Sequence, residues 1–399
     1  MKDILQIDEP TGGPLGFADR SVGEVALRNL SDSGSSGDWL YLLLEARRVL
    51  RPNGFLTLTP GKNLTEGEMH RLIALIGLEP DSADANGSRR ELPAGACRFV
   101  KPDRSVAGSP RVSIAIPAYS SKYFEESLAS ALRQSYQNIE ILVCDDSSSD
   151  DIEKITTGLG RNRPIRYVRN PGRLGARANY TKCFELANGE FVKFLNDDDT
   201  LEPHCVEGLL SAFRQAPDIS LATSYRIRID QHGQRLPDQP ATRPIARQDV
   251  ILHGPALANA MLMAGLNIVG EPSTVLFRKS DLLNVRPSYF TFDGVLGHGV
   301  IDMTMWSTLL LKGDAVFFCD GLSHFRIHPE QQQADPNIRA RGIEGIRNLQ
   351  AAWLGLGLHL RYDRNEMLAR AFPYKDNSAP PPPSSPARSG TAPKLWRYC

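Results

Sequence analysis

Four short apolar runs recur between residues 112 and 195, and segments with helical periodicity separate them. The runs are VSIAIP, IEILVC, IRYV and FVKFL, and they are rich in β-branched residues. Short strands that are apolar on both faces are typical of a parallel sheet covered by helices. The alternation therefore predicts an α/β fold with a mainly parallel sheet flanked by helices.

Two acidic clusters directly follow strands of this pattern. Asp145 and Asp146 follow IEILVC, and Asn196-Asp197-Asp198-Asp199 follows FVKFL. Ligands of open α/β sheets bind at the carboxyl ends of the strands. Carboxylates at neighbouring strand ends repel one another unless a cation lies between them, and Mg²⁺ or Mn²⁺ prefers such oxygen ligands. We therefore predict a divalent metal site. A solvated turn that caps the next helix is the alternative for the Asp triplet taken alone.

Several motifs, in order, resemble the family-2 glycosyltransferases, which have the GT-A fold. The motifs are VSIAIPAYSSKYFEESLASALRQSYQNIEILVCDDSSSDD, NPGRLGARANY, FVKFLNDDDTLEP, GEPSTVLFRKS, HGVIDMTMWSTLLLKGD and HFRIHPEQQ. The resemblance extends over residues 110–332, more than half of the chain. It implies inverting, metal-dependent transfer of a sugar from a nucleotide-sugar donor to an acceptor hydroxyl.

The resemblance also implies roles for donor-side residues. Tyr119 would stack on the base, and Asp146 would accept the imide N–H that uracil and thymine offer, which favours UDP- or dTDP-linked donors. Asp198 would be the main metal ligand, supported by Asp197 and His328. The full set of nucleotide-binding residues implied is Pro117, Tyr119, Asp145, Asp146, Arg177 and Asp197.

The second half of the resemblance concerns catalysis and the diphosphate. Asp302 aligns with the general base of a Glu-Asp pair, and Ile301 replaces the Glu of that pair. Arg326 and His328 resemble a pair that lies near the diphosphate and the metal. Asn196 stands where the family often has Asp.

Residues 1–105 resemble the second half of a class I SAM-dependent methyltransferase. LGFADRSVGEVALRNL and YLLLEARRVLRPNGFLTLTP provide a strand, a helix, an R-P-N-G turn and another strand. Residues 1–100 contain no G-x-G motif, so the cofactor-binding half is missing. We therefore expect a small α/β region that is not catalytic and that serves structure or docking.

The remaining boundaries follow from composition. Residues 333–375 are predicted to be a helical segment with Ile343, Ile346, Leu349, Trp353 and Leu356 on its apolar side, and the Pro-rich residues 376–399 a disordered tail. Lys+Arg and Asp+Glu balance at 46 each, which argues against a nucleic-acid partner. The acidic N-terminus, the scattered cysteines and the lack of a long apolar run lead us to expect a cytoplasmic protein, with a position at the inner face of the membrane left open.

We therefore expect a glycosyltransferase of surface polysaccharide biosynthesis whose acceptor is a glycan or a lipid-linked glycan. Three other functions stay open. A non-catalytic scaffold that binds nucleotide-sugars fits Ile301 beside Asp302. A methyltransferase is disfavoured by the missing glycine turn, and a sugar-nucleotide pyrophosphorylase by AYSSKY, which stands where its Gly-rich basic loop should be.

Overall fold

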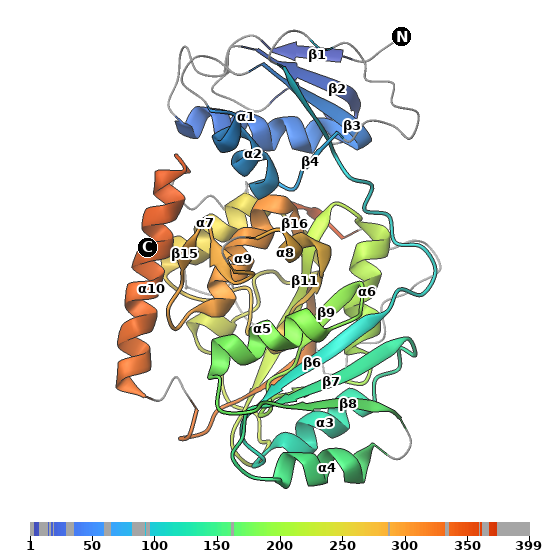
Figure 1. Ribbon diagram of the computed structural model, residues 1–399, viewed down its shortest axis with the longest axis vertical. Helices are drawn as coiled ribbons and strands as arrows, with labels where there is room; N and C mark the ends of the chain where they lie inside the picture. Colours follow the sequence, from blue (N-terminus) through green and yellow to red (C-terminus); the bar gives the residue numbers. More distant parts are fainter. Residues whose placement is uncertain are drawn as a thin grey trace.

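The structure is a computed structural model that describes residues 4–7, 15, 17–18, 20–28, 36–59, 65–81, 92, 96–160, 163–285, 288–331, 335–358, 360 and 367–372. The chain forms a small N-terminal unit and a larger unit below it (Figure 1). The tail predicted at residues 376–399 lies outside the described residues.

The N-terminal unit is a sheet with the strand order β1-β2-β3-β5-β4. β1, β2 and β3 are parallel, and β5 runs antiparallel to both of its neighbours, β3 and β4. Two helices, α1 and α2, connect the strands on the side that faces the larger unit (Figure 1). The elements are β1 Ile4–Ile7, β2 Val22–Leu27, α1 Ser36–Val49, β3 Leu50–Leu58, α2 Glu66–Leu75, β4 Glu79–Pro80 and β5 Cys97–Val100.

The predicted alternation of strands and helices is present in the larger unit. Its first half contains β6 Val112–Ala118, α3 Phe124–Leu132, β7 Ile139–Asp145, α4 Asp151–Leu159, β8 Ile165–Arg169, α5 Ala176–Leu186 and β9 Phe191–Phe194. These four strands pair in parallel in the order β9-β6-β7-β8. The α/β fold class is therefore confirmed.

The strand order changes one sequence-based expectation. The acidic clusters after β7 and β9 are not on neighbouring strands, because β6 lies between these two strands. Sequence order cannot reveal this, because the first strand of a doubly wound sheet commonly sits in its interior. The site is consequently centred on the end of β6.

The second half of the larger unit extends the same sheet. Its elements are β10 Thr200–Leu201, α6 Cys205–Gln215, β11 Ile219–Ile229, β12 Val250–Leu252, α7 Gly254–Ala264, β13 Leu276–Arg278, α8 Ser280–Leu283, β14 Thr291–Phe292, β15 Val295–Leu296, α9 Ile301–Lys312 and β16 Asp314–Arg326. β11 and β16 are parallel, whereas β13 joins β9 to β11 by antiparallel pairing. β14 and β15 form a separate hairpin.

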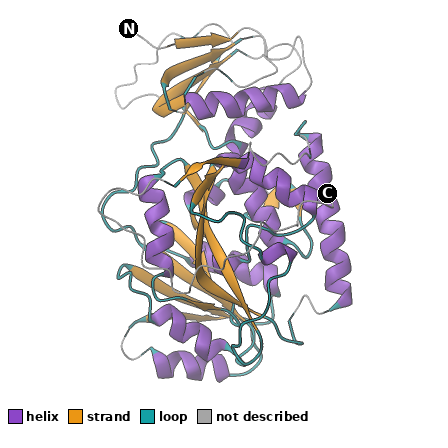
Figure 2. Cartoon of the chain, turned by 180° about the vertical axis from the view of Figure 1, so that it is seen from behind, coloured by secondary structure: helices purple, strands orange, loops and turns teal. Residues whose placement is uncertain are grey.

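The two faces of the sheet carry two different cores, which Figure 2 shows as helices on both sides of the strands. Ile114 and Ile116 of β6 face the core beneath α3 and α6, whereas Ala115 faces the core that includes α5, α7 and α9. This period of two is the strand geometry expected for a sheet that is buried on both faces.

The C-terminal segment contains one long helix. α10 Pro336–Gly355 buries Leu349 and Trp353, yet Ile343 is 55% exposed. The helix meets the loop before α9 through glycine instead: a Cβ at Gly345 would lie 2.3 Å from the His298 carbonyl oxygen. The segment also contributes a strand, β17 Leu368–Ala371, which pairs with β12. Among the described helices, none combines the length and apolarity that crossing a membrane requires.

Candidate active site

The loop after β6 is held by an acid from the neighbouring strand. Asp197 Oδ2 accepts the backbone N–H groups of Tyr119 and Ser120, both at 2.7 Å. Burial, together with the charge of Asp198, raises the pKa of Asp197 to about 6. Tyr119 itself remains 47% exposed, and the Arg173 guanidinium lies 4.6 Å from its ring centre. A fixed loop thus presents an open aromatic face.

The acid after β7 holds a second loop. Asp146 is buried; its Oδ1 accepts the N–H of Leu174 at 2.7 Å and its Oδ2 accepts the N–H of Gly175 at 2.8 Å. Asn170 Nδ2 also donates to Oδ1, at 2.8 Å. Asp146 and Asp197 therefore have the same structural role, because each carboxylate accepts backbone N–H groups of one loop at the edge of the site.

Three other residues predicted to bind nucleotide surround these loops. Asp145 is buried and accepts the N–H of Ser147 at 2.8 Å and the Tyr167 hydroxyl at 2.6 Å. Pro117 lies within β6, next to its end. Arg177 is exposed in the first turn of α5 and lines a cavity of about 640 Å³ between α5 and the β14–β15 hairpin.

Asp198 and His328 form a pair. Asp198 Oδ2 lies 3.1 Å from His328 Nε2, and Gln331 Nε2 lies 3.4 Å from the same oxygen. The side chains of Asp198 and His328 are only 21% and 9% exposed. His328 Nδ1 is buried and has no hydrogen-bond partner among the described residues. A carboxylate oxygen and an imidazole with a vacant nitrogen are donors that Mn²⁺ accepts, although no set of three His, Cys, Asp or Glu ligands occurs in the described part of the chain.

Asp199 joins three separate segments beneath that pair. Its Oδ2 accepts the Ser273 hydroxyl at 2.6 Å and Asn196 Nδ2 at 3.0 Å, and its Oδ1 accepts the N–H of Arg326 at 3.0 Å. Burial and the nearby charge of Asp198 raise the pKa of Asp199 well above its usual range. The amide of Asn196 supplies a donor here, whereas a carboxylate at this position would add a further repulsive charge.

Arg326 is more enclosed than the sequence suggests. Its side chain is 1% exposed and pairs with Glu126 at 2.6 Å, while its Nε donates to the Asp198 carbonyl at 2.8 Å. Its guanidinium also lies over the ring of Tyr123, 4.5 Å from the centre. These contacts hold Arg326 against the backbone of Asp198. Its predicted contact with a diphosphate stays a prediction.

Asp302 stands at the first turn of α9. Its Oδ2 accepts Asn267 Nδ2 at 2.7 Å, and its Oδ1 accepts the N–H of Met303 at 2.8 Å. Burial raises the pKa of Asp302 to about 6, with a further contribution from Glu271. Asn267 is itself fixed, because it exchanges two hydrogen bonds with Gly270. The carboxylate therefore has one orientation and an elevated basicity.

The hydroxyl of Tyr180 connects the two halves. It donates to Asn196 Oδ1, directly before the acidic cluster. The pKa of Tyr180 is raised well above its usual value, first by burial and then by the charges of Asp199, Asp302, Asp198 and Asp197. Asp302 and the acidic strand end therefore face one neighbourhood, although more than a hundred residues separate them in sequence.

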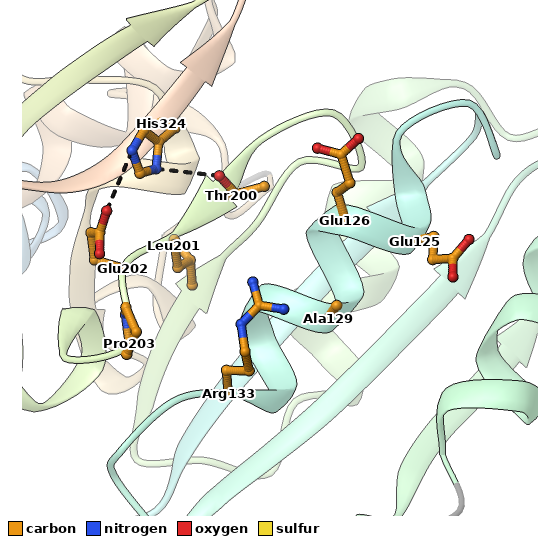
Figure 3. A pocket seen from close by; sticks show the side chains of 9 residues that line it. All are labelled: Glu125, Glu126, Ala129, Arg133, Thr200, Leu201, Glu202, Pro203 and His324. Atoms are coloured by element: carbon orange, nitrogen blue, oxygen red, sulfur yellow. Dashed lines mark hydrogen bonds and ion pairs between the residues drawn. The ribbon is translucent and has the colours of Figure 1, made fainter. Parts of the chain in front are cut away.

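A further cavity lies outside this neighbourhood. It has a volume of about 490 Å³, and Figure 3 shows it between α3 and the segment that follows β9. Its polar lining includes Glu125, Glu126 and Glu202, with His324 located 3.4 Å from Glu202. None of the predicted site residues lines it.

Comparisons with known proteins identify the family of the chain. The sequence model of "Glycosyl transferase family 2" matches residues 113–281. An uncharacterized glycosyltransferase of Rickettsia prowazekii, RP339, is 33% identical over 254 residues, 62% of this chain and 72% of the relative. The chain belongs to glycosyl transferase family 2, and the protein is a glycosyltransferase.

Other matches are partial. Chondroitin synthase of Escherichia coli is 39% identical over 130 residues, which cover 31% of this chain and only 18% of that enzyme. The solved structure of TarS 1-349 of S. aureus in complex with UDP aligns with a TM-score of 0.44 and 15% identity, over 63% of this chain and 67% of that one.

Several residues that shape the site were given no role by the sequence analysis. Tyr180, Asn267 and Ser273 act through contacts with segments that are distant in the chain. Asn267 could have been noticed, because it stands just before the acceptor-side motif GEPSTVLFRKS. Tyr180 and Ser273 lie within the motifs NPGRLGARANY and GEPSTVLFRKS, but only the fold shows which contacts they make.

Proposed function

We propose that this glycosyltransferase moves a sugar from a UDP- or dTDP-linked donor to a hydroxyl of a glycan or lipid-linked acceptor, with inversion at the anomeric carbon. One observation carries the proposal. One short segment holds both a basic carboxylate and the acidic strand end: Asn267 Nδ2 donates to Asp302 Oδ2 at 2.7 Å, and the Ser273 hydroxyl donates to Asp199 Oδ2 at 2.6 Å. A base on one side and a diphosphate-binding group on the other is what a single displacement requires.

The donor would lie over the end of β6. The exposed ring of Tyr119, beside Arg173, supports stacking of a base. Oδ1 of Asp146 accepts from Asn170 and Leu174, whereas Oδ2 accepts only from Gly175, and the remaining acceptor position on Oδ2 supports the proposed bond to the base imide. Asp145, Pro117 and Arg177 complete the proposed nucleotide set.

A divalent metal would be held by Asp198 and His328, with Asp197 supporting the loop above them. The remaining ligands would be water and donor phosphate, as is usual for Mg²⁺ and Mn²⁺ in such sites. When bound, the metal offsets negative charge on the leaving diphosphate, an effect worth several kcal/mol. We further propose that Arg326 positions the peptide of Asp198 through their 2.8 Å contact.

Asp302 would act as the general base. The acceptor hydroxyl transfers its proton to a carboxylate oxygen of Asp302 while its own oxygen forms a bond to the anomeric carbon. The bond between that carbon and the diphosphate oxygen breaks, and its electron pair leaves with the diphosphate. A pKa of about 6 gives Asp302 more basicity than an ordinary aspartate while leaving it ionised at neutral pH.

One relative supports a place in polysaccharide synthesis. The chain is 39% identical to chondroitin synthase of Escherichia coli over 130 residues. A cytoplasmic location at the inner face of a membrane, where lipid-linked acceptors are found, is part of the proposal. The rival function, a scaffold without catalysis, is favoured by Ile301 in place of an acid beside Asp302 and by the N-terminal region, which resembles only half of a methyltransferase.

A thermal-shift panel of UDP, dTDP, GDP and CDP, with and without MnCl₂, tests the proposal. UDP or dTDP should stabilise the protein only when the metal is present, and a nucleotide-sugar of the same class should then be hydrolysed slowly. Stabilisation without any hydrolysis would favour the scaffold. Stabilisation by SAM, with no effect of any nucleotide, would overturn the proposed function.

A further inference from the structure

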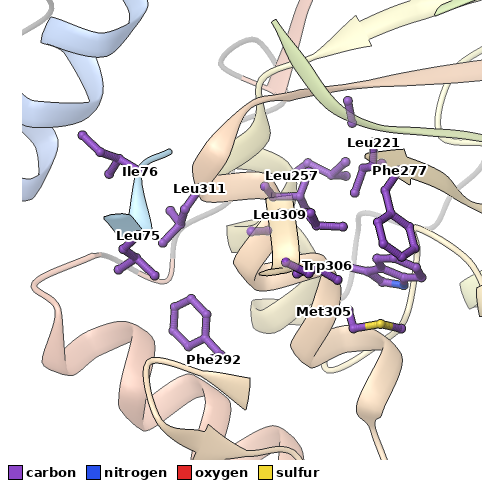
Figure 4. Packing of buried hydrophobic residues seen from close by; sticks show 14 of the residues in the cluster. Leu75, Ile76, Leu221, Leu257, Phe277, Phe292, Met305, Trp306, Leu309 and Leu311 are labelled. Carbon is purple, nitrogen blue, oxygen red and sulfur yellow. The ribbon is translucent and has the colours of Figure 1, made fainter. Parts of the chain in front are cut away.

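The N-terminal unit shares a core with the larger unit. Leu75 and Ile76, at the end of α2, belong to the same buried cluster as Leu311 of α9 and Phe292 of β14 (Figure 4). Burying a leucine contributes about 1.5–3 kcal/mol. Contacts of this kind resemble the interior of one domain and not a mobile junction between two.

Charged contacts hold the carboxyl end of α9, on the side of the N-terminal unit. The Arg47 guanidinium donates to the carbonyl of Lys312, the last residue of α9. Arg104 pairs with Asp281 at 2.8 Å, and Lys312 Nζ donates to the Asp281 carbonyl at 2.5 Å. A cation at the last carbonyl groups stabilises the carboxyl end of a helix. The opposite end of this helix carries Asp302.

The third contact reaches the β14–β15 hairpin. Arg71 of α2 donates from Nε to Asp293 Oδ1 at 2.6 Å and from Nη2 to Oδ2. Asp293 and Gly294 form the two-residue turn of the hairpin, with φ angles of +49° and +80°, the conformation that short hairpins require. A hairpin with only two strands is marginally stable alone, so a bidentate clamp on its turn restrains it.

The hairpin leads to the proposed base through a tightly packed path. From Leu296 the chain passes through Gly297, His298 and Gly299 to α9. Gly299 adjoins α10 so closely that a Cβ there would lie 2.9 Å from the Gly342 nitrogen. Because this segment is tightly packed, a displacement of the hairpin would be transmitted to Asp302.

We propose that the N-terminal unit is a positioning module, in which Arg71 fixes the hairpin and thereby the placement of Asp302 and of the wall that Leu296 contributes to the cavity beside α5. The inference rests on the proposed role of Asp302. Arg71 touches no reacting atom and acts through Asp293.

The test uses two variants of the full-length protein that break the clamp from opposite sides. Arg71→Met keeps the length of the side chain. Asp293→Gly removes the carboxylate but suits the positive φ, so the turn itself is not weakened. Arg28→Met, at an exposed arginine of the same unit, is the matched control, and Arg71→Lys tests partial rescue by a single charge.

Hydrogen–deuterium exchange over residues 291–302 and steady-state hydrolysis of UDP-glucose and UDP-N-acetylglucosamine are the readouts. Both clamp variants should increase exchange there and lower kcat by about tenfold to 10²-fold, the cost of a small misplacement. KM and the UDP–Mn²⁺ thermal shift should stay at the wild-type values. Arg71→Lys should recover part of kcat, and Arg28→Met should behave as wild type.

Unchanged exchange and kcat in both clamp variants would overturn the positioning role. So would an increase in exchange that extends over the whole chain, because a smaller folded fraction lowers kcat while KM stays unchanged. Should the wild type hydrolyse no nucleotide-sugar, the proposed function fails, while the exchange measurement still decides whether Arg71 restrains the hairpin.

Discussion

Asp197 on the donor side and Asp302 on the acceptor side have similarly raised pKa values, but their hydrogen bonds differ. Asp197 and Asp302 both have a pKa of about 6, and burial is the main cause for each. Asp197 accepts hydrogen bonds from the N–H groups of Tyr119 and Ser120 and so holds the loop after β6. Asp302 is oriented by Asn267 and by its own helix. The first arrangement suits binding, and the second leaves a lone pair free to take a proton.

The largest effect should come from the donor side. Asp198→Ala removes the carboxylate that lies beside His328, and we expect the stabilisation by UDP with Mn²⁺ to disappear together with turnover. Thermal shift with and without MnCl₂ measures the first effect. Full retention of the metal-dependent shift would move the metal site away from Asp198.

On the acceptor side, Asp302→Asn should separate turnover from binding. The substitution keeps size and shape but removes proton affinity, so turnover should fall at least ~10²-fold. Nucleotide affinity should hardly change, since Asp197, Asp198 and His328 remain. Wild-type turnover in this variant would show that another group is the base. Asp293 would be a weak replacement because Arg71 already occupies it, which leaves His298 as the next residue to test.

The pH dependence of turnover should report the raised pKa of Asp302. Because the base must be ionised, turnover should rise by about tenfold per pH unit below pH ~6 and level off above it. The stability contribution has the opposite sign. Between pH ~4 and ~6 the folded protein retains a proton that the unfolded chain releases, so the contribution of Asp302 to the free energy of unfolding falls as pH rises. Turnover of the wild type that does not change from pH 5 to pH 8 would contradict the assignment.

The smallest effect should come from Asp199, next to the pair of Asp198 and His328. Asp199→Asn places an amide where three donors, from Ser273, Asn196 and Arg326, now meet two oxygens. One donor then loses its acceptor, at a cost of about 1–3 kcal/mol. Chemical denaturation of the two proteins measures the difference, and Glu125→Gln, at an exposed residue of α3, serves as a control. Equal midpoints would show that Asp199 is dispensable for the fold.

The sequence was sufficient for the elements of the parallel half of the sheet, because buried β-branched runs and amphipathic helices are local signals. It was also sufficient for the acids at strand ends. The sequence could not predict contacts between residues that are far apart in the chain. The central place of β6, the enclosure of Arg326 by Glu126 and the exposure of Ile343 all depend on long-range packing. The clamp between Arg71 and Asp293 joins residues 222 positions apart, and no local pattern indicates it.

The shared core also imposes an order on synthesis. Leu75 and Ile76 leave the ribosome long before Leu311, their partner in the same cluster. At about 5–20 residues per second, this interval lasts roughly 10–50 s. During that time the end of α2 is an uncovered apolar surface on the nascent chain. Aggregation during expression should therefore depend on translation rate and on chaperones that bind this surface, and purified protein should unfold in a single thermal transition.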